Sequence, residues 1–220
     1  MTMLGLDLFC GAGGITKGWQ RAGFKMLGVD IDPQPNYPGD WFVQADVLSL
    51  SPEFLRRFDV ICASPPCQLF VQGLKNFPNP PNEFLNLIPA TRALLTKAGV
   101  PWVMENIPGA PLRPDVRLGG WMFPELKVIR ERWFECSFPI DTPAYRKPRG
   151  LLAKGFLSIA GNGTQKYCVD RGYRRATIAN CSDAMGIDWM TRAEISQAIP
   201  PAYAEFIARA FLAKRARAAA

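Results

Sequence analysis

The stretch Leu4-Gly5-Leu6-Asp7-Leu8-Phe9-Cys10-Gly11-Ala12-Gly13-Gly14 decides the fold of this chain. Its first part is mainly apolar and predicts a buried strand, and its glycines predict a tight turn. We expect a helix from about Ile15 to Ala22, closed by Gly23 at the position where a helix end favours glycine. A second strand, Lys25 to Asp30, follows. This order is typical of a parallel sheet covered by helices.

The same alternation of strands and helices continues to about residue 140. Antiparallel strands at the far edge of the sheet are indicated by alternating patterns over 127–134 and beyond. Residues 141–176 are the least regular part. The fold class that we predict is α/β, with a Rossmann-like, mixed and mainly parallel sheet. The further expected strands are 42–46, 59–63 and 102–106, and the further expected helices are 52–58, 83–98 and 202–213.

Length and composition favour one globular domain with a sizeable core, because the 220 residues are 48% hydrophobic and 20% charged. The amino terminus resembles no signal peptide, and no apolar run is long enough to span a bilayer. We therefore expect a soluble, cytoplasmic protein. Six cysteines without a CxxC pair indicate reduced thiols.

The chain contains no histidine, which excludes every catalytic arrangement that needs imidazole and most metal centres. We predict no metal. A net charge of +7 and a pI near 9.3 favour a polyanionic partner such as nucleic acid, although a solvated basic face would have the same composition.

The glycine turn is typical of a nucleotide-binding site, where backbone amides approach a ligand. Asp30 ends the next strand, nineteen residues after Gly11, at the position from which an acid accepts hydrogen bonds from ribose hydroxyls. Asp46, after the third strand, could meet an exocyclic amine. The glycine spacing matches a dinucleotide fingerprint poorly, so a single nucleoside is favoured. The alternative is a structural turn with incidental carboxylates.

Ser64-Pro65-Pro66-Cys67-Gln68 follows the expected strand 59–63. Two prolines cannot continue a ladder, so Cys67 is held at a rigid corner at the carboxyl end of a strand. A thiolate there is a strong nucleophile. Alternatively, Cys67 is a small buried hydrophobe. A nucleoside cofactor, a positioned thiol and a basic surface together suggest group transfer to a nucleobase.

These motifs resemble those of the cytosine-5 DNA methyltransferase family, whose members use S-adenosylmethionine and have the class I methyltransferase fold. Their order and spacing agree from residue 7 to 140 and again near the end. The matching segments are 7–14, Asp30-Ile31-Asp32, Ala45-Asp46-Val47, 64–68, Glu105-Asn106-Ile107-Pro108-Gly109, Arg130-Glu131-Arg132 and Gln197-Ala198-Ile199-Pro200-Pro201.

The resemblance implies S-adenosylmethionine as cofactor and S-adenosylhomocysteine as product. The residues expected to bind the cofactor are Asp7, Phe9, Cys10, Gly11, Ala12, Gly13, Gly14, Asp30, Ile31, Asp46, Val47, Pro65, Gln197, Ala198 and Ile199. Those expected in catalysis are Cys67, Glu105, Arg132, Arg130, Asn106, Pro66 and Gln68.

The implied reaction is methylation of carbon 5 of cytosine. Cys67 would add to carbon 6, Glu105 would protonate or share a proton with ring nitrogen 3, and Arg132 would hold the oxygen at position 2. A base inside a duplex must first be flipped out of the stack, and the 70–81 loop could close over it. Leu69-Phe70-Val71 replaces the family's usual small-aromatic-serine run, and Gln197 stands where asparagine is common.

The resemblance also divides the chain into a catalytic and cofactor-binding domain, 1–140, a reduced target-recognition region, 141–192, and a returning carboxyl-terminal helix, 193–220. Only about sixty residues separate Arg132 from Gln197, so the region would read a short site. Double-stranded DNA is the expected partner, and a monomer is favoured. The residues expected to contact nucleic acid are Gln72, Lys75, Arg146, Lys147, Arg149, Arg171, Arg174 and Arg175. Solvated basic loops are the alternative.

Small size and the resemblance favour an enzyme of bacteriophage or prophage origin that shields DNA from restriction. Two alternatives remain open. The same chemistry could act on RNA or a free cytosine nucleotide, or the chain could be an inactive nucleic-acid-binding member of the fold. The presence of Cys67, Glu105 and Arg132 together argues against an inactive copy.

Overall fold

The computed structural model describes residues 2–71, 85–159 and 176–219. Within them a seven-stranded sheet has the order β3-β2-β1-β4-β5-β7-β6. The strands from β3 to β5 in this order are parallel, and β7 and β6 are antiparallel to their neighbours, which confirms the predicted mixed, mainly parallel sheet. The strands are β1 Leu4–Leu8, β2 Lys25–Asp30, β3 Trp41–Gln44, β4 Val60–Ala63, β5 Trp102–Asn106, β6 Val116–Leu118 and β7 Arg132–Cys136.

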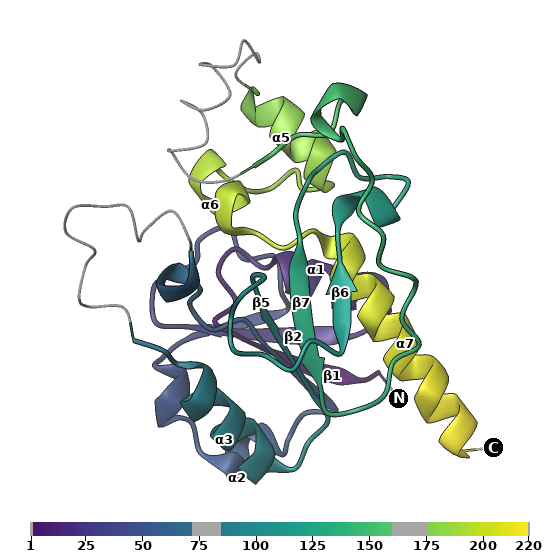
Figure 1. The fold of residues 1–220 in the computed structure, drawn as a ribbon. Coiled ribbons are helices and arrows are strands. Elements are labelled where there is room, and N and C mark those ends of the chain that lie inside the picture. The colour runs from purple at the N-terminus through teal and green to yellow at the C-terminus, as the bar shows by residue number, and fades with distance from the viewer. Residues whose placement is uncertain (1, 72–84, 160–175, 220) are drawn as a thin grey trace.

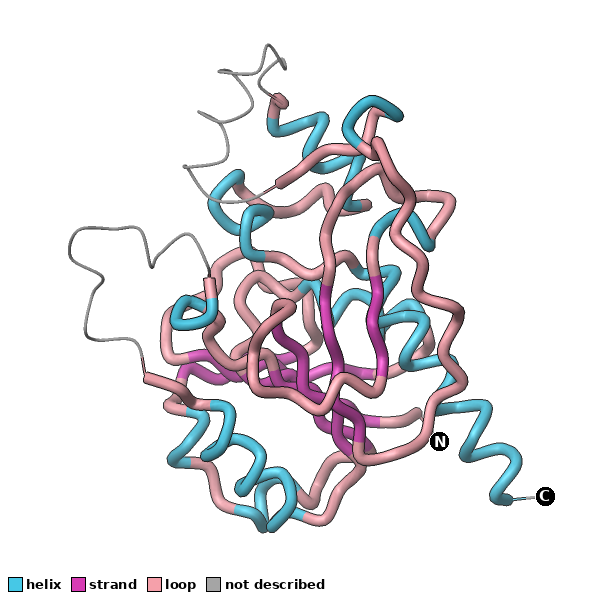
Figure 2. The backbone as a smooth tube through the Cα atoms, viewed as in Figure 1, coloured by secondary structure: helices cyan, strands magenta, loops and turns pink. Residues whose placement is uncertain are grey.

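Helices cover both faces of the sheet, with the strands gathered between them (Figure 1, Figure 2). Helices α2 and α3 lie against one face, and α1 and the long α7 pack together at the other. A Cβ at Gly18 of α1 would come within 2.3 Å of the Pro201 carbonyl oxygen, so glycine permits this close approach. The helices are α1 Gly14–Arg21, α2 Pro52–Leu55, α3 Ile88–Ala98, α5 Ile178–Met185, α6 Arg192–Gln197 and α7 Pro201–Ala219.

Side chains of the central strands alternate between two cores, as the pleat requires. In β4, Val60 and Cys62 join the core formed with α1 and α7, whereas Ile61 and Ala63 join the core formed with α2 and α3. The few buried polar side chains include Asp7 of β1 and Glu105 of β5. Because burying a carboxylate costs free energy, both side chains need hydrogen-bond or ionic partners.

The site-forming edge of the sheet follows from its topology. The chain moves outward from β1 through β2 to β3, and then crosses to β4 and β5 on the other side of β1. The strand order reverses between β1 and β4, and ligands of open α/β sheets bind at the carboxyl ends of strands at such a point. The glycine turn follows β1 there, and the Pro-Pro-Cys corner follows β4.

Several predicted boundaries were wrong. The helix predicted from residue 83 begins at Ile88, where the Asn86 side-chain oxygen accepts a hydrogen bond from the Ile88 N–H. The short helix predicted over 52–58 ends at Leu55, and the strand predicted over 42–46 ends at Gln44. At the carboxyl end, the basic Ala/Arg stretch extends α7 to Ala219, because alanine and arginine are good helix formers.

The antiparallel edge also differs from its prediction. Only the end of the predicted 127–134 stretch enters the sheet, because β7 begins at Arg132. Residues before it make one isolated bridge, between Val128 and Leu157. The short strand β6 was not predicted, since three residues give too little alternation to recognise. In the described ranges, no helix is both long and apolar enough to cross a membrane.

Candidate active site

The turn after β1 is shaped by three residues with positive φ, Phe9 at 56°, Gly11 at 48° and Gly13 at 76°. The Gly13 N–H donates to the Cys10 carbonyl at 3.0 Å, which closes the turn. A Cβ at Gly13 would meet Pro38 Cδ at 2.4 Å, so the position requires glycine for space as well as conformation. At Gly11 a Cβ would meet no other atom within 4 Å. The backbone of the turn is therefore open at Gly11.

Asp30 lies beside this turn, as the sequence predicts. Its Oδ2 accepts a hydrogen bond from the Gly11 N–H at 2.9 Å, and its Oδ1 accepts one from the Asp32 N–H at 3.1 Å. The side chain is half-buried. A carboxylate has capacity for further hydrogen bonds beyond these two, so Asp30 can support the turn and still accept from hydroxyl groups.

Asp7 lies beneath the turn and is 1% exposed. Its Oδ2 accepts from the Thr16 N–H at 3.1 Å and the Thr16 hydroxyl at 2.7 Å. Thr16 Oγ1 also lies 2.8 Å from the Tyr37 hydroxyl oxygen. Burial raises the pKa of Asp7 to about 7, against the hydrogen bonds from Thr16, which lower it. The contacts of Asp7 thus connect the turn to α1 and to the segment after β2.

The end of β3 supplies a second carboxylate. Asp46 Oδ1 accepts from the Leu48 N–H at 2.9 Å and caps a short 3₁₀ helix, Val47–Ser49. Val47 is 2% exposed and packs in the core, so any ligand contact there would come from its backbone. By contrast, Ile31 is 64% exposed and Leu48 39% exposed. Apolar surface beside two carboxylates suits a flat heteroaromatic ring with a ribose.

The carboxyl-terminal segment returns to the glycine turn. A Cβ at Gly14 would come within 2.2 Å of the Ile199 carbonyl oxygen, so these backbones are in direct contact. The Trp189 indole N–H donates to the Ala12 carbonyl at 2.8 Å. Ala198 follows the end of α6, where Gln197 is exposed. The structure thus brings Ile199 to the turn.

The Pro-Pro-Cys corner begins directly after β4. Pro65 is buried and Pro66 is exposed. Asn106, which is 1% exposed, donates from its side-chain amide to the Pro65 carbonyl at 2.8 Å. Cys67 is half-buried and precedes a 3₁₀ turn, Gln68–Phe70. The Asn106 hydrogen bond therefore fixes the corner that presents Cys67.

Glu105 and Arg132 form a buried ion pair beside this corner. Arg132 Nε lies 2.8 Å from Glu105 Oε1, and Glu105 is 5% exposed. Adjacent antiparallel strands β5 and β7 supply the two residues. Burial raises the pKa of the Glu105 carboxyl, although Arg132 and Arg130 act to lower it. A carboxyl group of this kind can hold a proton at a higher pH than an ordinary glutamate.

Arg130 is also buried, at 5% exposed. Its Nη1 donates to the Ile159 carbonyl at 2.7 Å, and its own carbonyl accepts from the Tyr203 hydroxyl at 2.6 Å. Its Nε and Nη2 have no hydrogen-bond partner among the described residues. Burial and the charge of Arg132 lower the pKa of Arg130 to about 9. Two unpartnered buried donors make Arg130 a candidate for binding an electronegative ligand atom.

Acidic and basic neighbours both affect the pKa of the Cys67 thiol. Burial, followed by the negative charge of Glu105, raises the pKa of the Cys67 thiol. Arg132 and Arg130 act in the opposite direction. Gln68, next in the chain, has a buried side-chain oxygen without a hydrogen-bond partner among the described residues. The site therefore unites a protonated thiol, a carboxyl group and two guanidinium groups.

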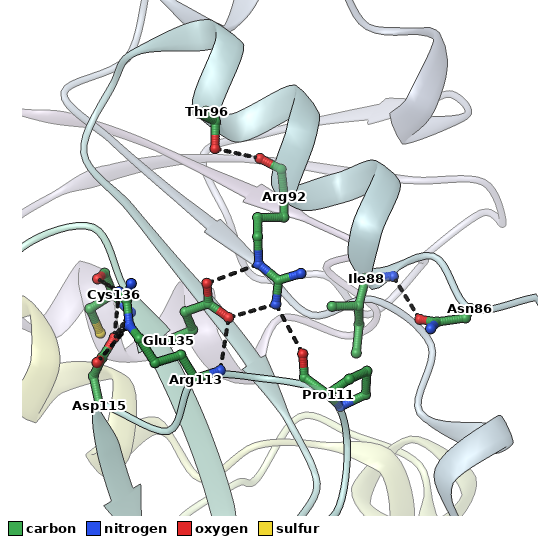
Figure 3. Close-up of polar contacts among 9 residues, drawn as sticks. All are labelled: Asn86, Ile88, Arg92, Thr96, Pro111, Arg113, Asp115, Glu135 and Cys136. Carbon is green, nitrogen blue, oxygen red and sulfur yellow. Dashed lines mark hydrogen bonds and ion pairs between the residues drawn. The ribbon is translucent and has the colours of Figure 1, made fainter.

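The segment after Asn106 is anchored away from this cluster by a second glutamate–arginine pair, in which only the glutamate is buried (Figure 3). Arg92 of α3 donates to both oxygens of Glu135 on β7, at 2.9 and 2.7 Å. The same guanidinium donates to the Pro111 carbonyl, and the Arg113 N–H donates to Glu135. These contacts hold 107–115 against the sheet edge that carries Arg132.

The predicted nucleic-acid contacts are only partly described. Arg146 and Arg149 are exposed, and Lys147 forms an ion pair with Glu131. The remaining five, Gln72, Lys75, Arg171, Arg174 and Arg175, lie outside the described residues. Part of the 70–81 loop lies outside them as well.

The sequence analysis did not identify several supporting residues, namely Thr16, Tyr37, Trp189 and Tyr203. Thr16 follows the glycine turn by one helical turn, and its spacing from Asp7 could have identified it. Trp189 is 177 residues from Ala12, and no local pattern indicates that contact.

Comparison with known proteins agrees with this geometry. Residues 3–110 match the model of the C-5 cytosine-specific DNA methylases. This half of the chain belongs to that family. Type II methyltransferase M1.HphI of Haemophilus parahaemolyticus is 33% identical over an alignment 128 residues long, which covers 49% of this chain and 33% of that protein. M.XorII of Xanthomonas oryzae is 35% identical over an alignment 82 residues long, which covers 30% of this chain and 19% of that protein. The matches thus span a third or less of these relatives.

Solved structures share the fold over nearly the whole chain. A DNMT2 variant from Spodoptera frugiperda has a TM-score of 0.62 at 13% identity, covering 96% of this chain and 100% of that one. The S. pombe Dnmt2 methyltransferase has a TM-score of 0.60 at 13% identity, covering 95% and 98%. A structure described as a DNA modification methyltransferase encoded within an E. coli prophage has a TM-score of 0.61 at 16% identity, covering 96% and 99%.

Proposed function

We propose that this protein transfers a methyl group from S-adenosylmethionine to carbon 5 of cytosine in DNA. The observation that carries the proposal is the Glu105–Arg132 pair beside Cys67, with two nitrogens of Arg130 that have no partner within the described part of the chain. The family of residues 3–110 supports the same reaction. Two of its relatives are named type II methyltransferases.

The cofactor would be held at the glycine turn. Its backbone amides, the Asp30 carboxylate and the Asp46 carboxylate provide donors and acceptors suited to a nucleoside. The exposed side chain of Ile31 suits the face of an adenine ring. When bound, S-adenosylmethionine supplies an electrophilic methyl group for carbon 5.

The protein residues would activate the base. The Cys67 thiol loses its proton to water, the thiolate forms a bond to carbon 6, and the ring electrons move so that carbon 5 becomes nucleophilic. Glu105 donates a proton to ring nitrogen 3, and Arg132 neutralises charge at the oxygen on position 2. After methylation, water or hydroxide removes the proton from carbon 5. The electrons of that bond then expel Cys67, nitrogen 3 returns its proton to Glu105, and the ring is restored.

The raised pKa of Cys67 fits this sequence of events. Glu105 in its charged form is one of the groups that raise it. While Glu105 holds the proton that it donates to nitrogen 3, it carries no charge to oppose the thiolate, and Arg132 and Arg130 favour the thiolate. Attack by Cys67 is therefore favoured before that proton is transferred. In duplex DNA the cytosine must first be flipped out of the stack.

The test is to incubate the protein with labelled S-adenosylmethionine and duplex DNA, RNA or dCMP, and then to digest the products and identify 5-methylcytosine. We expect label in DNA, and none with Cys67→Ser. Label only in RNA or dCMP would move the same chemistry to another substrate. Label in none of the three would overturn the proposal.

The cofactor side has its own test. Asp30→Ala should weaken S-adenosylmethionine binding by about tenfold or more, because a hydrogen bond to a charged group contributes about 1.5–3 kcal/mol. Isothermal titration calorimetry measures this directly. Asp32→Ala, an adjacent exposed aspartate, is the control. Equal affinities for both variants and the wild type would remove Asp30 from the pocket.

A further inference from the structure

Glu131 lies between the two arginines of the site, and its own carboxylate is engaged elsewhere. Its Oε2 accepts a hydrogen bond from the Tyr145 hydroxyl, and its Oε1 forms an ion pair with Lys147. Both partners belong to the irregular segment after β7. Glu131 therefore connects this segment to the stretch that carries Arg130 and Arg132.

Both partners of Glu131 are held by an aromatic side chain. The Tyr145 and Trp121 ring centroids lie 5.7 Å apart, and Lys147 Nζ lies 5.7 Å from a Trp121 ring centroid. Trp121 in turn packs on Gly119, where a Cβ would come within 2.3 Å of the indole ring. Burial, then the contact with Glu131, raises the pKa of the Tyr145 hydroxyl, so the hydroxyl remains a donor. We name Trp121, Tyr145 and Lys147 the Glu131 clamp.

The backbone of Glu131 leads directly to the reacting groups. Arg132 Nη1 donates to the Glu131 carbonyl at 2.8 Å, while Arg132 Nε pairs with Glu105 at 2.8 Å. The Arg132 guanidinium is thus held by two residues, Glu105 and Glu131, and Glu131 is the one that the clamp holds. A bond of the clamp restricts the Glu131 peptide, and the peptide restricts Arg132.

We propose that Glu131 is a positioning residue, which the clamp holds so that the Arg132 guanidinium stays against Glu105 and beside Cys67. Its effect on methyl transfer rests on the proposed function. Because Tyr145 and Lys147 lie in the segment predicted to recognise the target, the clamp also joins that segment to the groups that act on the base. Lys147 then contributes to the site through Glu131 as well as through any phosphate contact.

The test compares Glu131→Ala, which removes both clamp bonds, with Glu131→Gln, which retains an acceptor for Tyr145 and removes only the ion pair. Glu125→Ala is the matched control, since Glu125 is exposed and has no hydrogen bond or ion pair within the described residues. We measure kcat and KM on DNA, and KM for S-adenosylmethionine. We also measure the pH profile of iodoacetamide alkylation at Cys67, resolved by peptide mass spectrometry.

For Glu131→Ala we expect kcat to fall at least about tenfold, with the KM for S-adenosylmethionine unchanged. The midpoint of Cys67 alkylation should move to higher pH, because Arg132 lowers the pKa of that thiol. Glu131→Gln should recover part of both effects, and Glu125→Ala should resemble the wild type. Wild-type kcat and an unshifted alkylation profile in Glu131→Ala would overturn the proposal.

Two further outcomes remain decisive. If the wild type transfers no methyl group to DNA, the proposed function fails, and the alkylation profile alone decides whether Glu131 positions Arg132. If Glu131→Ala does not fold, as judged by circular dichroism, Tyr145→Phe replaces it. Removing that hydroxyl should shift both readouts in the same direction and by less, and no shift would contradict the role of the clamp.

Discussion

Two buried glutamates on neighbouring strands each pair with an arginine, and their carboxylates differ in the number of hydrogen bonds that they accept. Glu105 of β5 pairs with Arg132 through one recorded contact of 2.8 Å. Glu135 of β7 accepts from two nitrogens of Arg92 and from the Arg113 N–H (Figure 3). Both carboxylates are nearly inaccessible, at 5% and 4% exposed.

Their pKa values shift in opposite directions. Burial opposes the charged form of both residues. At Glu135 the hydrogen bonds from Arg92 and Arg113 together outweigh burial, and the pKa is lowered. At Glu105 burial prevails, and the pKa is raised. The number of hydrogen bonds to the carboxylate therefore separates a group that stays charged at neutral pH from one better able to exchange a proton.

This difference indicates that the Glu135 pair stabilises the fold and that the Glu105 pair can exchange a proton with a substrate. Glu135 braces α3, the segment 107–115 and β7. Glu105 lies beside Cys67, where two nitrogens of Arg130 have no partner among the residues that the structure describes. A site that must bind a polar base needs such unsatisfied groups, and the fold tolerates their free-energy cost because the other pair is fully bonded.

The largest expected effect is on activity. Glu105→Gln should lower kcat by about 10²–10⁴-fold, because glutamine cannot donate a carboxyl proton to the base. Glu135→Gln should leave kcat of the folded protein within about threefold of wild type, since this side chain braces the sheet away from Cys67. Steady-state methylation assays on both variants make the comparison. Equal losses of kcat would contradict the division of roles.

Stability should show the reverse order. Glu135→Gln should lower the free energy of unfolding by about 2–4 kcal/mol, because the amide presents N–H groups to Arg92 in place of a charged acceptor. Glu105→Gln should change it by less than about 1 kcal/mol near pH 8, since it removes a poorly solvated charge. Urea unfolding followed by circular dichroism measures both. A more destabilised Glu105→Gln would break the comparison.

The pH dependence of stability sharpens the contrast. Glu135 has a lowered pKa in the folded state, so its contribution exists above its unfolded pKa of about 4.3 and is lost as pH falls through the folded value. Glu105 has a raised pKa, so stability declines as pH rises from the unfolded value through the folded one. Urea midpoints from pH 3 to 8 should show a smaller acid loss in Glu135→Gln and a smaller decline in Glu105→Gln. Unchanged profiles would refute both assignments.

The smallest effect tests geometry alone. Arg92→Lys retains the charge opposite Glu135 but cannot donate two parallel hydrogen bonds, so we expect a loss of about 1–2 kcal/mol in unfolding free energy. Arg209→Lys, at an exposed ion pair with Glu205 on α7, is the control and should change it by less than about 0.5 kcal/mol. Differential scanning calorimetry measures the melting temperatures of the two variants. Equal melting temperatures would contradict this account.

Local pattern predicted the parallel core, and the position of Asp30 beside the glycine turn, for a physical reason. Strand, glycine turn and helix follow one another in the chain, and the carboxyl ends of parallel strands meet at one edge, so Gly11, Asp30 and Cys67 were expected together. The antiparallel edge was predicted less well. β6 is short, and its place depends on pairing with β7 rather than on its own pattern.

Local sequence patterns could not predict the contacts between distant segments. Asn106 holding Pro65, and Trp189 holding Ala12, depend on the packing of elements that no local periodicity specifies. The two glutamates illustrate the same limit. In the sequence Glu135 is an ordinary strand residue, and only its three hydrogen bonds reveal that it supports the edge.

Covalent capture of Cys67 tests directly whether this residue is the nucleophile. Duplex DNA containing 5-fluorocytosine, with S-adenosylmethionine present, should form a denaturation-resistant complex with the wild-type protein. Fluorine replaces the hydrogen on carbon 5, so no proton can be removed there and the covalent adduct persists. Peptide mass spectrometry should locate the bond at Cys67, and Cys67→Ser should form no complex. A complex that survives that substitution, or that maps to another residue, would contradict the account.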